Sequence, residues 1–283
     1  MRVAWLGFLA VTSCGTSTLS VVAEPGGAAL PVVSPSPDWP RSGVRLSPPP
    51  VVVPASLQGR VIAIDAGHGA PGNTGAQSAT CRAEADVVLP IAEAVAEYLE
   101  NAGLSVVRLR PPGQSPSYSR RLARLSASEA ELMISIHGDI RGQGVPWDAP
   151  DGCDGLWLAG QWGTAVLWTD EDPTRTEGRR RLAHALSQRL ASTNFVPYDG
   201  ENYESLYETS APGAFISRHR PGSRIGFLRK PSVPSVIVEV GHLLDPSVED
   251  RLGEPRVRAA LAQAILGGVV DTLSPLPGEP SRQ

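Results

Sequence analysis

Three short apolar runs in this sequence each end abruptly in a group of polar side chains. The runs and the polar residues that follow them are Val61–Ile64 with Asp65 and His68, Leu132–Ile136 with His137 and Asp139, and Val236–Val238 with Glu239 and His242. Short apolar runs rich in β-branched residues predict buried strands. Because sites in open α/β sheets form outside the carboxyl ends of the strands, we expect these polar groups to gather at one rim.

Helical patterns alternate with these strands. Residues 84–102 carry apolar side chains at helical spacing, and Gly103 follows as a C-cap. Pro90 is costly deep inside a helix, so this helix is expected to start near Pro90 or to kink there. A further strand is predicted at 104–110, and further helices within 118–130, 179–192 and 256–273. The alternation predicts a single α/β domain with a mostly parallel or mixed central sheet and helices on both faces.

Bulk properties exclude two function classes. The chain has 283 residues, of which 41% are hydrophobic, which is ordinary for a globular protein. Its net charge of −4 gives no basic footprint for nucleic acid, so no nucleic-acid partner is expected. No stretch approaches the ~20 apolar residues of a membrane span.

The first 23 residues are typical of an export signal: Arg2, a short apolar run and then small residues. Residues 11–14, V-T-S-C, also resemble a bacterial lipobox, in which Cys14 would carry the lipid anchor. A plain signal cleaved after Ala23, or a chance cysteine, is the alternative. We therefore expect a protein of the cell envelope, either periplasmic or lipid-anchored, in the outer membrane if the cell is Gram-negative, and touching membrane only through Cys14.

Residues 24–56 contain nine prolines and little periodicity. Such a stretch predicts a disordered, extended linker of polyproline character. The catalytic domain is accordingly predicted at 57–274, and a flexible tail at 275–283.

Three cysteines are present. Setting Cys14 aside leaves Cys81 and Cys153, an even pair that suits an oxidising compartment. A disulfide between them is the favoured interpretation, and two unrelated thiols are the alternative. Their spacing does not match a structural zinc finger.

Two histidines and a carboxylate at one rim are what a catalytic zinc ion requires, because such sites have three protein ligands and one open position. Taken alone, a histidine after a strand is more often a hydrogen-bonded structural residue. A glutamate within V-I-V-E-V-G is less ordinary, because a buried, unpaired carboxylate is costly and needs a cation or a proton.

Four motifs occur in an order and spacing that resemble the zinc-dependent N-acetylmuramoyl-L-alanine amidases of the Amidase_3 type. They are D-A-G-H-G at 65–69, E-A-D at 84–86, S-I-H-G-D at 135–139 and P-S-V-I-V-E-V-G-H-L at 234–243. The matches cover nearly the whole predicted domain. The resemblance implies an amidase/phosphorylase-hydrolase-like fold and peptidoglycan as the substrate.

Site roles also follow from this resemblance. It implies that His68, Glu84 and His137 hold Zn²⁺ and that Glu239 is the catalytic general base. The bond cleaved would join the lactyl group of N-acetylmuramic acid to L-alanine, releasing stem peptide from glycan. For Glu84, capping of a helix N-terminus is the alternative role.

Two other functions compete with this one. A non-catalytic peptidoglycan-binding or regulatory protein on an amidase scaffold would be expected to lack a ligand or Glu239, and none is lost. The second competing function is that of a different envelope zinc hydrolase, such as a peptidase. The sequence has no H-E-x-x-H motif for a thermolysin-like site.

Several nearby residues admit two interpretations. Asp65 and Asp139 could orient the free ring nitrogens of the histidine ligands, or could serve in turns. Either His219 or His242 could contact substrate, although a surface or packing role is favoured for both. The segment 140–172 looks like an insertion, and its tryptophans could line a sugar groove or fill a small core. These are Trp147, Trp157, Trp162 and Trp168.

Overall fold

The structure, a computed structural model, describes residues 46, 48–149, 152–203, 205–220 and 225–275. The predicted export signal, Cys14, most of the predicted linker and nearly all of the predicted tail lie outside the described residues. Within the described ranges, no helix has the length and apolar character needed to cross a membrane.

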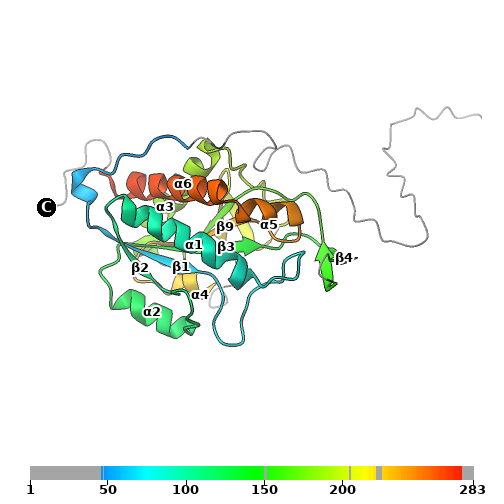
Figure 1. Cartoon of the computed structure of the whole chain (residues 1–283). Coiled ribbons are helices and arrows are strands. Elements are labelled where there is room, and N and C mark those ends of the chain that lie inside the picture. Colours follow the sequence, from blue (N-terminus) through cyan, green and yellow to red (C-terminus); the bar gives the residue numbers. More distant parts are fainter. Residues whose placement is uncertain (1–45, 47, 150–151, 204, 221–224, 276–283) are drawn as a thin grey trace, which may run out of the picture. The chain divides into compact units, whose positions relative to one another are not determined.

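A seven-stranded mixed sheet forms the centre of the domain (Figure 1). Its strand order is β2-β1-β3-β9-β6-β8-β7. Strands β2, β1, β3 and β9 run parallel to one another, β6 is antiparallel to β9, β8 is parallel to β6, and β7 is antiparallel to β8. The strand bounds are β1 Val61–Ala66, β2 Ser105–Arg108, β3 Leu132–Asp139, β6 Ala165–Trp168, β7 Tyr207–Ala211, β8 Ala214–Ser217 and β9 Ser235–His242. The predicted α/β class with a mixed sheet is confirmed.

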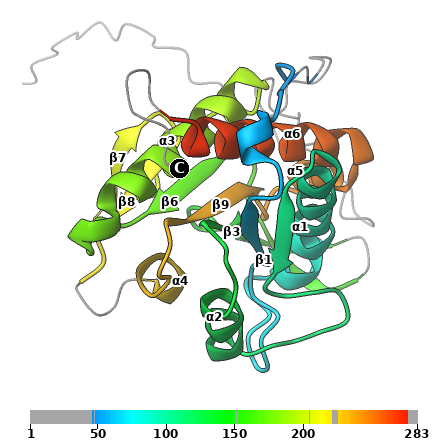
Figure 2. The ribbon, with the colours of Figure 1, turned by 90° about the vertical axis from the view of Figure 1, so that its left-hand side faces the viewer.

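Helices cover both faces of this sheet (Figure 2). One face packs against α1 (Glu84–Asn101), α3 (Pro173–Ser192) and α6 (Pro255–Leu273), and the opposite face carries the shorter α2 (Tyr118–Ser126) and α4 (Gly226–Arg229). Alternate residues of β3 divide between the two faces, as the pleat of a strand requires. Ile134 and Ile136 belong to the larger core under α1, α3 and α6, whereas Met133 packs with residues of α2 and α4.

Helix α1 begins six residues before Pro90, which lies inside the helix, so the first of the two alternatives, a start near Pro90, is wrong, and a kink at Pro90 stays a prediction. Backbone hydrogen bonds from outside the helix explain the earlier start. The N–H of Glu84 donates to the carbonyl of Ala76 at 2.8 Å, and that of Ala85 donates to the carbonyl of Thr74 at 3.0 Å. The preceding loop thus satisfies donors that the first turn leaves free.

The segment between β3 and α3 is more regular than the sequence suggests. It contains a two-stranded antiparallel hairpin, β4 (Val145–Asp148) with β5 (Asp154–Trp157), and the central-sheet strand β6. Helix α3 also starts earlier than predicted, because Pro173 stands in its first turn and the side chain of Asp172 caps it. The remaining short elements are η1 (Ala55–Leu57) and α5 (Pro246–Gly253).

The described part of the predicted linker packs on the folded domain. Leu46, Val51 and Val53 lie against the larger core, and the side-chain amide of Gln263 in α6 donates to the carbonyl of Pro49 at 3.1 Å. Apolar residues between the prolines explain this contact, since they bury surface that a polar linker would not have.

The close approach of α3 and α6 gives a test of the packing. A Cβ on Gly268 of α6 would lie 2.6 Å from Cδ2 and 3.0 Å from Cα of Leu186 in α3. We expect Gly268→Ala to lower the free energy of unfolding by about 1–3 kcal/mol, because overpacking exceeds the gain in helix propensity. Chemical denaturation measures the change.

Gly253→Ala is the matched control, since a Cβ at the end of α5 would meet nothing within 4 Å. We expect this variant to equal the wild type or to be slightly more stable. A Gly268→Ala protein as stable as the control would contradict the packing described.

Candidate metal centre

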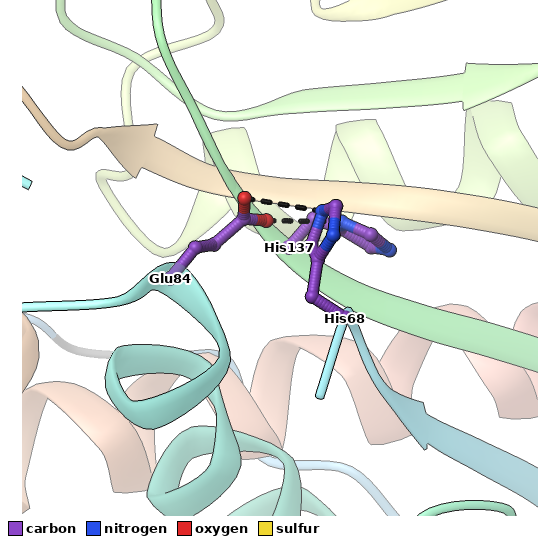
Figure 3. A group of neighbouring side chains, drawn as sticks. All are labelled: His68, Glu84 and His137. Atoms are coloured by element: carbon purple, nitrogen blue, oxygen red, sulfur yellow. Dashed lines mark hydrogen bonds and ion pairs between the residues drawn. The ribbon is translucent and has the colours of Figure 1, made fainter. Parts of the chain in front are cut away.

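Three side chains that are far apart in the sequence meet at the carboxyl ends of β1 and β3 (Figure 3). His68 follows β1, His137 lies in β3 and Glu84 is the first residue of α1. One ligand atom from each lies within 4.8 Å of the others, and no other such group of three or more occurs among the described residues. The structure thus brings together all three residues that the sequence suggests as metal ligands.

The carboxylate of Glu84 lies between the two histidines. Its Oε2 is 3.1 Å from Nε2 of His68, and its Oε1 is 3.0 Å from Nδ1 of His137. The backbone N–H groups of Ala76 and Gly138 each donate to this carboxylate at 3.1 Å. Burial raises the pKa of Glu84, but the hydrogen bonds from His137 and His68 outweigh it and lower the pKa to about 2.

Asn73 sets the tautomer of His68. The Oδ1 of Asn73 accepts from the N–H of Gly75 at 3.1 Å, so it is an acceptor toward Nδ1 of His68, 2.8 Å away. Nδ1 therefore carries a hydrogen, and the lone pair of the neutral ring is on Nε2, facing Glu84. Two acceptors at that distance need a proton or a cation between them, and imidazole nitrogen with carboxylate oxygen is a donor set that fits zinc.

The pKa of His68 reflects the same contact. Burial lowers this pKa, but hydrogen bonding to the Glu84 carboxylate more than compensates, and the net shift is upward. In the absence of a metal ion, a proton shared with Glu84 is therefore favoured at this position.

Two glycines give the site its space. A Cβ on Gly67 would lie 2.6 Å from the ring of His137. A Cβ on Gly75 would lie 2.6 Å from Oε2 of Glu84, and the φ of Gly75 is +81°. Any side chain at either position would displace a candidate ligand.

Two arginines hold the turn that carries His68, which has the left-handed φ of 56° that is uncommon outside glycine. Arg110 donates to the carbonyls of Ala66 at 2.8 Å and Gly67 at 3.1 Å. Arg121 of α2 donates to Ala66 at 3.0 Å and also to the carbonyl of His68. Neither arginine was expected at this site from the sequence, because both contacts depend on tertiary structure that no local pattern encodes.

Asp65 does not orient a histidine ligand through any hydrogen bond in the described structure. It accepts instead from Arg121 at 3.1 Å and from the hydroxyl of Ser135 at 2.7 Å. The residue that hydrogen-bonds Nδ1 of His68, a role that the sequence suggested for Asp65, is Asn73. The side chain of Asp65 therefore fixes α2 to the sheet.

Asp139 has a similar structural role. Its carboxylate accepts from Nε of Arg141 at 2.9 Å and from the hydroxyl of Tyr203. The guanidinium of Arg141 is buried and lies 3.8 Å from the ring centroid of Tyr198. This network lies beside β9 and helps to shape the surroundings of Glu239.

Glu239 pairs with His137 in the β3–β9 register. Its side chain is 8% exposed, and its Oε2 has no hydrogen-bond partner among the described residues. Burial, together with the nearby charges of Asp139 and Glu84, raises the pKa of Glu239 well above its usual value. A buried carboxyl beside three candidate ligands, but outside the group itself, is suited to holding a proton.

Packing is the role of His242. It is fully buried, and its Nδ1 accepts from the backbone N–H of Arg141 at 3.1 Å. Burial and then the charge of Arg141 lower its pKa to about 4, so its ring is neutral near pH 7. His219 lies edge-on to Tyr207, with ring centroids 5.3 Å apart.

The four tryptophans of the segment 140–172 mainly make structural contacts. Trp168 is buried in the larger core and Trp162 packs against it, donating to Asp245 at 2.8 Å. Trp147 donates to the carbonyl of Ala79 at 3.0 Å, and Trp157 ends β5 in the same hairpin.

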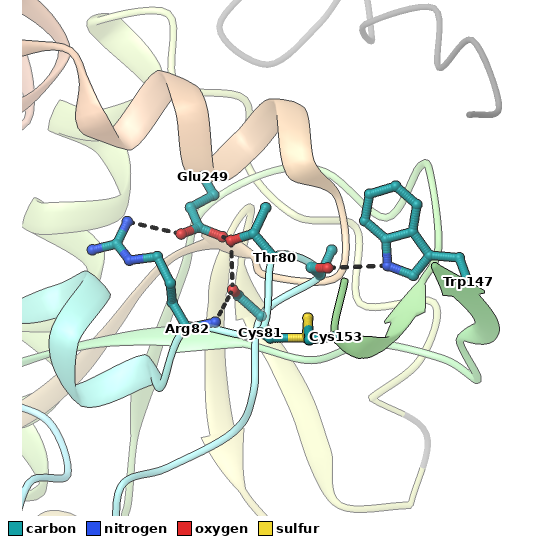
Figure 4. The surroundings of a disulfide bond; sticks show 8 residues. Thr80, Cys81, Arg82, Trp147, Cys153 and Glu249 are labelled. Carbon is teal, nitrogen blue, oxygen red and sulfur yellow. Dashed lines mark hydrogen bonds and ion pairs between the residues drawn. A yellow bond between two sulfur atoms is a disulfide. The ribbon is translucent and has the colours of Figure 1, made fainter. Parts of the chain in front are cut away.

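A disulfide between Cys81 and Cys153 fixes the hairpin to the loop before α1 (Figure 4), as the sequence predicts. On the other side of this loop, Glu249 of α5 accepts from Thr80 at 2.6 Å and from Arg82 at 2.8 Å. The loop that delivers Glu84 is therefore tied at 80, 81 and 82, immediately before the candidate ligand.

Comparisons with known proteins agree with this geometry. Residues 62–271 match the family model Amidase_3, N-acetylmuramoyl-L-alanine amidase. The N-acetylmuramoyl-L-alanine amidase AmiA of Escherichia coli is 29% identical over 229 residues, which cover 75% of each chain. The uncharacterized protein YqiI of Bacillus subtilis is 25% identical over 213 residues, covering 75% of this chain and 84% of that one.

The fold also has relatives among solved structures. The crystal structure of the apo form of the N-acetylmuramyl-L-alanine amidase Ami1 from Mycobacterium abscessus aligns with a TM-score of 0.59 at 19% identity. The alignment covers 77% of this chain and all of that one. At this identity the likeness establishes the shared fold.

Asn73 offers a test of how the site is ordered. We expect Asn73→Ala to weaken zinc binding about 10- to 100-fold, because the ring of His68 loses the acceptor that fixes its tautomer. Competition with a chromophoric chelator measures the affinity. Asn101→Ala, at the exposed end of α1, is the control, and equal affinities in the two variants would contradict the role of Asn73.

The pKa shifts predict a pH window for the metal-free protein. The stabilisation from Glu84, whose pKa is lowered, is present above the unfolded pKa of about 4.3 and is lost as pH falls toward about 2. The stabilisation from His68, whose pKa is raised, is present below the unfolded pKa of about 6.5. It is lost as pH rises through the pKa of His68 in the folded protein.

We therefore expect the difference in unfolding free energy between wild type and Glu84→Gln to be largest between about pH 4.3 and 6.5. Urea denaturation of chelator-treated protein at pH 3, 5.5 and 8.5 measures it. A difference that keeps growing toward the highest pH would contradict the assignment.

Proposed function

The chain belongs to the Amidase_3 family of N-acetylmuramoyl-L-alanine amidases, and on that premise we propose that it is a zinc-dependent peptidoglycan hydrolase. The bond cleaved is the amide between N-acetylmuramic acid and L-alanine, so that stem peptide leaves the glycan. The observation that carries this proposal is the convergence of His68, Glu84 and His137 beside buried Glu239, whose Oε2 has no hydrogen-bond partner among the described residues.

His68, Glu84 and His137 would hold the metal ion. Two imidazoles and one carboxylate leave an open coordination position, which is the pattern of catalytic rather than structural zinc. When bound in such a site, zinc supplies Lewis-acid polarisation of a carbonyl and makes water more acidic. Asn73 and the arginines around residues 66–68 keep His68 in place for this role.

Glu239 would act as the general base. Its Oε2 would take a proton from the attacking water and then deliver it to the nitrogen of the departing L-alanine, which leaves as an amine. A carboxyl whose pKa is raised by burial suits both halves of this transfer, since it must accept a proton and later release it near neutral pH. Its position opposite His137 in the sheet supports the assignment.

Export to the cell envelope belongs to the same proposal. The Cys81–Cys153 disulfide is consistent with an oxidising compartment, where the substrate also is. Residues 1–23 and Cys14, which predict the export signal and the lipid anchor, lie outside the described residues, and attachment through Cys14 stays a prediction from the sequence.

The non-catalytic alternative is not favoured. It predicts an incomplete site, whereas all three candidate ligands and Glu239 are present and close together.

The deciding experiment digests purified sacculi and analyses the products by mass spectrometry. We expect zinc-loaded wild type to release peptides that begin at L-alanine, and chelation to abolish the release. Glu239→Gln should lower the rate about 10²- to 10⁴-fold while still binding zinc, because Glu239 is outside the ligand group.

Glu129→Gln, an exposed residue beyond α2, is the control for the same chemical change and should keep the wild-type rate. Zinc-loaded wild type that binds sacculi without releasing peptide would overturn the proposal and leave the binding-protein alternative.

A further inference from the structure

A cavity of about 370 Å³ lies directly beside the candidate metal centre. One of its walls is formed by His68, Asn73 and His137. Whatever fills this cavity is therefore in contact with the site of the proposed reaction. The cavity is large enough for one or two amino-acid residues.

The other walls are mainly apolar. They come from Tyr118 and Leu122 of α2, Phe227 of α4, and Ile237 of β9. The rings of Tyr118 and Phe227 pack edge to face with centroids 5.3 Å apart, which joins α2 to α4 across the cavity. Figure 2 shows these two helices on the same face of the sheet. A sugar ring would leave most of its hydroxyl groups unpaired against such walls.

One cation stands at the edge of this apolar space. Lys230, at the C-cap of α4, lines the cavity. Its side chain runs past Gly226, where an added Cβ would lie 3.9 Å from Cδ and Cε of Lys230. Lys230 is exposed, and no ion pair or hydrogen bond joins its amine to another described residue. Among the residues that the structure describes, no aspartate or glutamate lines the cavity.

Lys230 is also the single lysine of the chain, since the other 24 basic residues are arginines. Most of the arginines near the site are committed to carbonyls or carboxylates, as the contacts of Arg110, Arg121 and Arg141 illustrate. A lysine at this position keeps its charge available to a ligand, because its stem is long and its ammonium group is a compact point charge.

We propose that this cavity binds the peptide side of the substrate and that Lys230 pairs with a carboxylate on the residue following L-alanine. The inference rests on the proposed function and orients the substrate of that site. The methyl group of L-alanine meets the apolar walls, the scissile amide lies at the wall formed by the two histidines, and the glycan extends away from α2 and α4. Lys230 is then a specificity-determining residue.

The first test compares two substrates that differ only in charge. They are N-acetylmuramoyl-L-alanyl-D-glutamate, with both of its glutamate carboxylates free, and the same compound with both carboxylates amidated. For wild type we expect kcat/KM to be about tenfold higher for the acid, because a charge-assisted contact is lost in the amide. Lys230→Met should remove this preference by slowing the acid alone, and Lys230→Arg should retain most of it.

Arg120→Met is the matched control, since Arg120 is an exposed cation of α2 that does not line the cavity. It should keep the wild-type ratio between acid and amide. If Lys230→Met also keeps that ratio, or if wild type shows no preference, the proposal is overturned.

The second test does not depend on catalysis. Because Lys230 is the single lysine, reductive methylation with ¹³C-formaldehyde labels it together with the amino terminus only, and Lys230→Arg identifies its NMR signal. On titrating zinc-loaded protein with L-alanyl-D-glutamate, we expect the Lys230 signal to shift, and to shift far less with the amidated dipeptide.

The two tests separate the two proposals. A charge-dependent shift without cleavage of either substrate would support the peptide site and count against the amidase activity. Cleavage with no shift and no preference for the acid would support the activity and overturn the peptide site.

Discussion

The buried carboxylate of Glu84 is the group on which the candidate site depends. A carboxylate with 3% exposure is costly unless donors surround it, and here two backbone N–H groups and two imidazole rings do so. Two of these donors, the ring of His68 and the N–H of Ala76, lie in the loop after β1, and the other two, the ring of His137 and the N–H of Gly138, lie in β3. Satisfying this one charge therefore holds the start of α1 against the loop after β1 and against β3, and a metal ion at that point would satisfy it further.

The surroundings of the site restrict each of these segments separately. Arg110 and Arg121 hold the carbonyls of the strained turn at 66–68, and Asn73 fixes the ring of His68. The loop before Glu84 is tied by the disulfide and by Glu249. Because the ligand side chains are already held in place, less conformational entropy is lost when a metal ion binds. Helices α2 and α4 lie on the face of the sheet opposite α1, α3 and α6. They place an apolar cavity and the single lysine of the chain next to the candidate ligands.

Much of this arrangement was predictable from the sequence because it follows from periodicity. Apolar runs that end in His68, His137 and Glu239 predict strands whose polar ends share one rim, and the structure has them there. The other parts depend on tertiary contacts that no local pattern encodes. The early start of α1 depends on carbonyls of the preceding loop, and the role of Asn73 depends on a turn that folds it back onto His68. The hairpin β4–β5 and the strand β6 lie in a segment with weak alternation.

We propose that a single metal ion binds between His68, Glu84 and His137. The most direct measurement is anomalous diffraction at the zinc absorption edge from crystals of the zinc-loaded protein. We predict one strong peak within bonding distance of an imidazole nitrogen of His68, an imidazole nitrogen of His137 and a carboxylate oxygen of Glu84. A peak at other residues, or no peak in protein shown to contain zinc, would contradict the claim.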